Sequence, residues 1–79
     1  MKPEEAFGQI LRELRGKKGF TQEKLALEAN LDRTFISLLE RGLRQPSLTT
    51  ILNIASILKI PTSHLMDLVE DAIKKGDDR

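Results

Sequence analysis

Residues 21–42 read TQEKLALEANLDRTFISLLERG, and their pattern predicts two short helices joined by a tight turn. Thr21 can cap the first helix with its hydroxyl, and Asn30 tolerates the left-handed backbone conformation that often ends a helix. Asp32 can cap the second helix, and Gly42 can stop it. The turn between the two helices is then only about three residues long, which is the spacing of a helix-turn-helix motif.

The two sides of the second helix, residues 33–41, differ in chemistry. At about 100° per residue, three of its apolar side chains fall on one side, namely Phe35, Ile36 and Leu39. They can pack under the apolar face of the first helix, which consists of Leu25, Ala26 and Ala29. The opposite side carries a mixed polar set: Arg33, Thr34, Ser37, Leu38 and Arg41. Such a set suits the DNA major groove, where Arg can make a bidentate contact with guanine, although its periodicity equally fits a solvated face of a helical bundle.

Apolar residues outside this motif also recur at every three or four positions, which predicts an all-α fold of five helices. The first helix would begin at Pro3 and end near Gly19, with an apolar stripe of Phe7, Ile10, Leu11 and Leu14. The fourth, capped by Ser47, would lie at the centre of the core, because it has little polar surface among Leu48, Ile51, Leu52, Ile54, Ala55, Ile57 and Leu58. A fifth helix would follow Pro61, capped by Thr62 or Ser63, and run through Lys75.

The composition limits the class of protein. Seventy-nine residues suffice for a single domain over 1–79, and 39% hydrophobic with 32% charged residues is typical of a globular chain. With no Cys and with His64 as the only His, we expect no metal site, no cofactor and no nucleophilic catalysis, and hence no enzyme. Acidic residues near the start argue against a secretory signal, and no apolar run approaches the roughly 20 residues of a membrane span, so we expect a cytoplasmic protein.

Residues 21–61 resemble the Cro/C1 (XRE) family of helix-turn-helix regulators. The matching features are Thr21-Gln22, Leu25-Ala26, Ile36, Glu40-Arg41-Gly42, Pro46-Ser47, Ala55 and Leu58. Asn30 and Lys59 stand where the family usually has Gly, and a left-handed conformation strains Lys more than Asn. The resemblance implies a five-helix, lambda-repressor-like DNA-binding domain with its helix-turn-helix core over about 10–65.

The resemblance also implies roles for individual residues. Base edges would be read by Arg33, Thr34, Ser37 and Leu38. Phosphates would be bound by Gln22, Arg41, Arg44, Ser47, Lys17 and Lys18. Glu40 is expected instead to pair with a nearby Arg or to cap groups within the domain.

The string NLDRTFISLLERG in a chain of this size is similar to the controller proteins of restriction–modification systems, which are small homodimers that regulate their own operon. Other small repressors and phage Cro-like proteins remain alternatives. Another is an antitoxin that has the same helix-turn-helix fold and binds a toxin. The resemblance therefore implies a prokaryotic or phage-encoded transcriptional regulator. Its expected partners are double-stranded DNA and a second copy of the chain, with no membrane and no small-molecule ligand.

The net charge of +1 is unevenly distributed along the chain. Residues 12–46 hold eight basic and five acidic groups, whereas residues 60–79 hold three basic and five acidic ones. A modest excess of +3 over the motif provides few phosphate contacts, so DNA binding favours a dimer that reads a pseudo-palindrome with recognition helices about 34 Å apart. The dimer interface is predicted on the apolar stripe of the last helix, about residues 63–75: Leu65, Met66, Leu68, Val69, Ala72 and Ile73.

Overall fold

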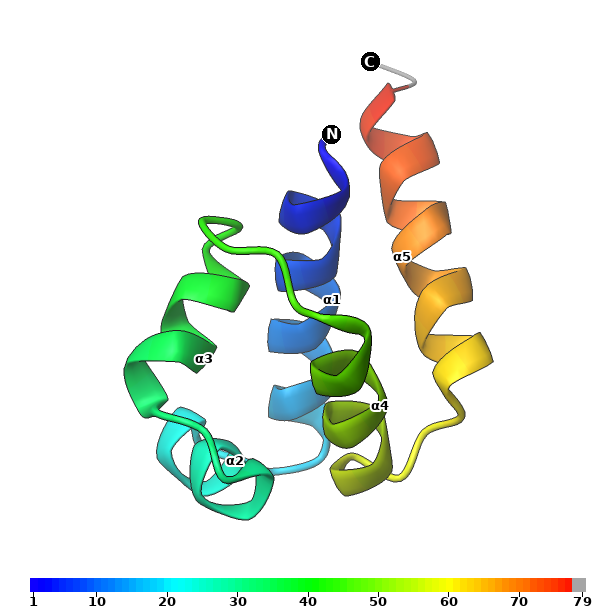
Figure 1. Ribbon diagram of the computed structural model, residues 1–79. Helices are drawn as coiled ribbons and strands as arrows, with labels where there is room; N and C mark the ends of the chain where they lie inside the picture. Colours follow the sequence, from blue (N-terminus) through cyan, green and yellow to red (C-terminus); the bar gives the residue numbers. More distant parts are fainter. Residues whose placement is uncertain (78–79) are drawn as a thin grey trace.

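The computed structural model describes residues 1–77, and these form five helices and no strand, which confirms the all-α prediction (Figure 1). The helices are α1 (Pro3–Lys17), α2 (Gln22–Ala29), α3 (Arg33–Glu40), α4 (Leu48–Ile57) and α5 (Thr62–Asp77). Over this part of the chain, no helix combines the length and apolar character needed to cross a membrane.

Side-chain hydroxyls start two of the helices as predicted. Thr21 Oγ1 accepts a hydrogen bond from the Lys24 backbone N–H (3.0 Å), and Ser47 Oγ accepts one from the Thr50 N–H (3.1 Å). Asp32 occupies the N-cap position of α3 as predicted, but its side chain makes no capping hydrogen bond. Its carboxylate charge still lies near the positive end of the helix dipole.

Left-handed residues end α2 and the turn after α4, as expected. Asn30 has a φ of 56° and Lys59 a φ of 57°. Asn tolerates this conformation, whereas the Lys side chain carries a steric cost of about 1–2 kcal/mol. Asn53 Nδ2 also donates to the Ala29 carbonyl (2.9 Å), so α4 holds the end of α2 next to the tight turn.

The core lies around α1, which packs between α3 and α5 while α4 lies across α2 and α5 (Figure 1). Every helix contributes to one cluster of buried side chains, whose largest members are Leu11, Leu25, Ile36, Leu39, Ile54, Leu58 and Leu65. The predicted apolar faces of the first three helices are confirmed as buried, with Leu14 and Phe35 only partly buried at the edge of the cluster.

The placement of α4 differs from the prediction. Leu48 and Leu52 are 71% and 50% exposed, and only Ile54, Ala55 and the C-cap residue Leu58 are fully buried. The helix packs on α2 and α5 through one face, so its other apolar face remains in solvent. The central position belongs to α1.

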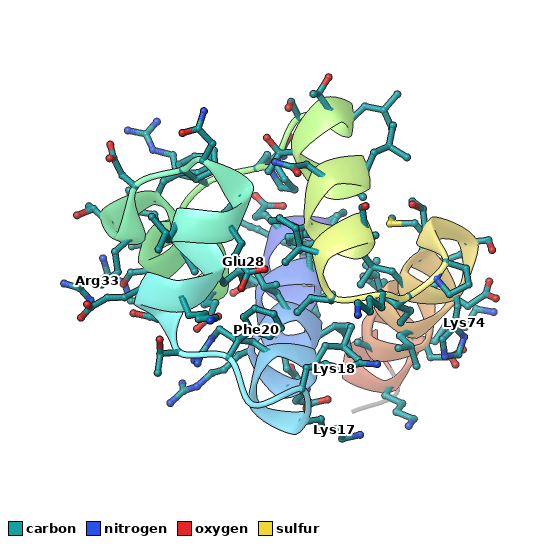
Figure 2. The ribbon with its side chains drawn as sticks, turned by 90° about the horizontal axis from the view of Figure 1, so that it is seen from below. Lys17, Lys18, Phe20, Glu28, Arg33 and Lys74 are labelled. Carbon is teal, nitrogen blue, oxygen red and sulfur yellow. The ribbon has the colours of Figure 1, made fainter. Side chains whose placement is uncertain are left out.

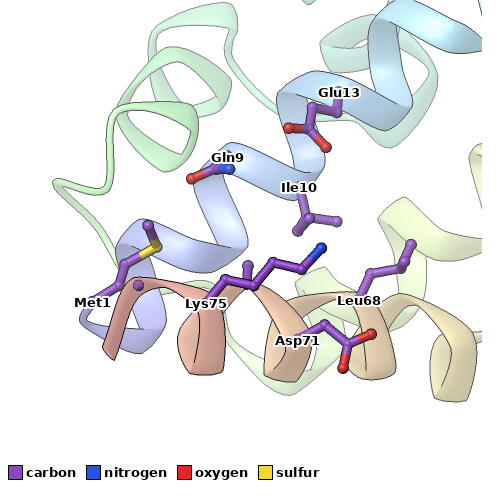
Figure 3. Close-up of a pocket in the computed structure, with 9 residues that line it drawn as sticks. Met1, Gln9, Ile10, Glu13, Leu68, Asp71 and Lys75 are labelled. Carbon is purple, nitrogen blue, oxygen red and sulfur yellow. The ribbon is translucent and has the colours of Figure 1, made fainter. Parts of the chain in front are cut away.

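The apolar stripe of α5 is divided between the core and its edge, which corrects the predicted interface for Leu65, Val69 and Ala72. Leu65, Val69 and Ala72 are buried in the core, and Met66, Leu68 and Ile73 pack against it in part. Leu68 lines a groove between α1 and α5 together with Glu13, Asp71 and Lys75 (Figure 3). In a chain this short, the core needs apolar side chains of α5 that the sequence had suggested would contact a second copy of the chain.

The backbones of α1 and α3 come into close contact at Gly8. A Cβ added to this buried glycine would lie 2.3 Å from the Leu39 carbonyl oxygen and 2.7 Å from that of Glu40. Both atoms belong to backbone and cannot rotate away. Gly8 is therefore required for α3 to lie against α1.

Replacing Gly8 by Ala should lower the free energy of unfolding by about 2–3 kcal/mol, because the overpacking outweighs the helix propensity that Ala adds. Gly16, in the same helix with nothing within 4 Å of an added Cβ, is the matched control. There the same substitution should raise the free energy of unfolding by roughly 0.5–1 kcal/mol. Urea denaturation measures both, and equal effects at the two sites would contradict the close approach of α1 and α3.

Candidate nucleic-acid interface

The outward side of α3 carries the residues predicted to read bases. Arg33 and Thr34, at the start of the helix, are exposed, and Ser37 and Leu38 are half-buried one turn further on. The opposite side of α3 is closed off by Ile36 and Leu39 in the core. Figure 2 shows the Arg33 side chain at the outer edge of the domain, away from the core. The structure therefore brings the four predicted base-reading residues together on one accessible helix face.

Gln22 lies beside the start of α3. It is the first residue of α2, it is half-buried, and its Oε1 accepts a hydrogen bond from Arg33 Nη1 (3.3 Å). The contact joins one predicted phosphate-binding residue to one predicted base-reading residue. The amino-terminal ends of α2 and α3 thus present amide, guanidinium and hydroxyl groups side by side, a mixture that can contact both a phosphate and a base edge.

Behind this surface lies an ion pair that ties α1 to α3. The Glu40 carboxylate, whose side chain is only 3% exposed, accepts from Arg15 Nε (2.6 Å) and Nη2 (3.1 Å). Arg15 also donates through Nη1 to the Phe20 carbonyl (2.9 Å), and Gln22 Nε2 donates to Glu40 Oε1 (3.0 Å). The prediction that Glu40 pairs with an Arg inside the domain is confirmed.

Sequence analysis missed the role of Arg15 in this network. Arg15 is one of several cations near the end of the first helix, Lys17 among them, and no local pattern distinguishes the one that turns inward. Its partner lies 25 residues away, so only the packing of α1 against α3 identifies the pair.

The loop after α3 provides further cationic and hydroxyl groups. Arg41, the C-cap residue of α3, and Arg44 are exposed. Ser47 is exposed too, but its hydroxyl already donates to Thr50 Oγ1 (3.0 Å) while it caps α4. Ser47 can therefore donate to a phosphate only by exchanging that hydrogen bond, whereas Arg41 and Arg44 have free donors for one.

Lys17 and Lys18 are not brought together with Arg33. Both are exposed at the end of α1. Figure 2 shows them well away from Arg33. That Lys17 and Lys18 bind phosphates remains a prediction, and any such contact would lie beside the face of α3 and not on it.

Comparison with known proteins places this arrangement in a family. The helix-turn-helix family matches residues 11–65. The control protein C.BamHI of Bacillus amyloliquefaciens is 45% identical over 62 residues, which span 77% of this chain and 76% of that protein.

Solved structures agree in fold as well as in sequence. The restriction-modification controller protein C.AhdI from Aeromonas hydrophila is 47% identical, with a TM-score of 0.75 over 78% of this chain and 94% of its own. The controller protein C.Esp1396I, as a tetramer in complex with its natural 35 base-pair operator, is 29% identical, with a TM-score of 0.82 over 92% and 96% of the two chains. On these matches in sequence and in fold, the chain belongs to the helix-turn-helix family of the Cro/C1 (XRE) type.

Proposed function

We propose that the protein is a sequence-specific, DNA-binding transcriptional regulator that reads base edges with α3. The observation that carries this proposal is the single accessible face of α3 that presents Arg33, Thr34, Ser37 and Leu38 beside the start of α2. Similarity to C.BamHI and C.AhdI supports the more specific role of a controller-like regulator of its own operon, acting in the cytoplasm of a prokaryotic or phage-infected cell and not as an enzyme.

The backbone contacts flank the base-reading face on both sides. Gln22 and the start of α2 would bind one phosphate, and Arg41, Arg44 and the start of α4 with Ser47 would bind another. Lys17 and Lys18 would add a weaker, longer-range attraction from the flank, which falls with salt concentration.

This division of roles separates Arg33 from Arg44. Replacing Arg33 by Ala should cost about 1–3 kcal/mol of binding to a DNA site selected from a random pool, and should relax the preference at one base pair. Replacing the exposed Arg44 by Ala should weaken binding to the selected site and to random DNA by the same factor and reduce its salt dependence.

Fluorescence anisotropy titrations at several salt concentrations measure both effects. If Arg33→Ala weakened selected and random DNA equally, Arg33 would have no base-reading role. If the unsubstituted protein selected no sequence at all, the proposed function would fail.

We place the homodimer contact on the exposed face of α4. Leu48 and Leu52 project one helical turn apart, and Leu43, in the preceding loop, is exposed as well. Residues 48–57 contain no charged side chain, so two copies can meet across a twofold axis without like-charge repulsion. The assembly of C.Esp1396I as a tetramer on its operator supports a second copy as the occupant.

An apolar groove also borders α4, at Ile51. It lies between α4, the start of α1 and α5, and Phe7, Pro46, Ile51 and Met66 contribute to its lining. Projecting leucines beside a groove form a surface that can be complementary to itself, as a twofold contact requires. Of the residues predicted from the α5 stripe, Met66 therefore stays in the proposed interface, and Leu65, Val69 and Ala72 belong to the core. The partly buried Leu68 and Ile73 stay a prediction.

Replacing Leu52 by Glu should yield a folded monomer, because the side chain is half exposed in one chain and a charge would have to be buried only on dimerisation. Leu27→Glu is the matched control, since Leu27 is 80% exposed and lies on α2, outside the proposed interface. Analytical ultracentrifugation should give the monomer mass for the first variant and the dimer mass for the second. A dimer mass for Leu52→Glu would rule out the α4 interface.

A further inference from the structure

We infer that Glu40 is a positioning residue for DNA recognition: its carboxylate orients the Gln22 amide, and this amide in turn holds the Arg33 guanidinium. The inference rests on the proposed function, because Arg33 is there assigned to a base edge. It gives Glu40, which lies behind the surface and touches no DNA, an effect on sequence preference in addition to its effect on stability.

The chemistry of the groups determines which end of the amide faces Glu40. A carboxylate only accepts hydrogen bonds, so the Gln22 amide must turn its nitrogen inward, where Nε2 lies 3.0 Å from Glu40 Oε1. The amide oxygen then points the other way, to a position 3.3 Å from Arg33 Nη1. Rotated by half a turn, the amide would present two oxygens to each other on one side and two donors on the other. The buried anion therefore decides that Arg33 meets an acceptor.

Glu40 can fix this orientation because it is itself immobilised. Arg15 holds the carboxylate with two hydrogen bonds and is held in turn by the Phe20 carbonyl. The Glu40 side chain is nearly inaccessible to water, so rotation would leave a buried charge without partners. The chain of contacts runs from α1 through the end of α3 to the starts of α2 and α3.

The consequence for Arg33 is preorganisation. An exposed Arg loses side-chain freedom when it binds a base, and a guanidinium that is already restrained loses less. Arg33 uses one donor on Gln22 and keeps others for a bidentate contact with guanine. The second hydrogen on Gln22 Nε2 remains available for a phosphate, so Gln22 can serve both contacts.

The test compares selected and random DNA for four proteins: unsubstituted, Glu40→Gln, Arg33→Ala and the double variant. A Gln at position 40 can offer either a nitrogen or an oxygen, so it no longer dictates the orientation of Gln22. Glu40→Gln should reduce the ratio of affinities for selected over random DNA by roughly 2- to 10-fold, the range of one hydrogen bond. In the Arg33→Ala background the same change should leave the ratio unaltered.

Two further variants separate positioning from stability. Arg15→Lys keeps a cation and leaves the carboxylate facing Gln22, so it should lower the melting temperature and leave the affinity ratio unchanged. Gln22→Met keeps the Arg15–Glu40 pair intact and removes the acceptor of Arg33, so it should reduce the ratio as Glu40→Gln does, even if Glu40→Gln folds poorly.

The outcomes are distinct. If Glu40→Gln and Gln22→Met weaken selected and random DNA by equal factors while Arg33→Ala changes the ratio, Glu40 has a structural role only and the inference is overturned. A ratio change of equal size in the presence and absence of Arg33 would also overturn it, because the effect would not pass through Arg33. If the unsubstituted protein selects no sequence, the proposed function fails first.

Discussion

The arrangement of the first three helices depends on the ion pair between Arg15 and Glu40. A buried pair of charges adds little net stability, since each loses its hydration on folding, but losing either partner leaves the other charge buried alone. The pair therefore contributes mainly to geometry: it sets the end of α3 against α1 and provides the anion to which Gln22 binds. Helix α3 is thereby held at its end by Glu40 and near its start through Gln22 and Arg33.

The same end of α3 is also in close backbone contact with α1. Gly8 admits the Leu39 and Glu40 carbonyls to distances that no side chain would allow, and the Arg15 guanidinium reaches the Glu40 side chain further along α1. The absence of a side chain at Gly8 and the charged side chain of Arg15 thus both favour the packing of α1 against α3. The face of α3 that points to solvent follows from this contact, because the face toward α1 is already occupied.

The apolar side chains of α4 and α5 are divided between the core and the exposed face of α4. Both α4 and α5 carry more apolar side chains than a surface helix needs, and a domain of 79 residues cannot bury them all. The core takes the α5 stripe, with Leu65 and Val69, and leaves Leu48 and Leu52 of α4 in solvent. The uncharged face of α4 lies directly after the loop that carries Arg44, so a contact there would join the two subunits beside the proposed DNA surface.

Signals that act within about four residues could be read from the sequence: the caps at Thr21 and Ser47, the left-handed end of α2 at Asn30, and the polar face of α3 set by the helical period. These depend on the local backbone, which the chain specifies wherever the helix forms. Tertiary packing alone decided three other matters: which cation of α1 turns inward to Glu40, that Asn53 holds the end of α2, and which of two apolar stripes enters the core. The partners in the two hydrogen-bonded contacts are 24 or 25 residues apart, and the stripes compete for a single interior. No local pattern encodes the outcome of such a competition, because it depends on how all five helices fill the same volume.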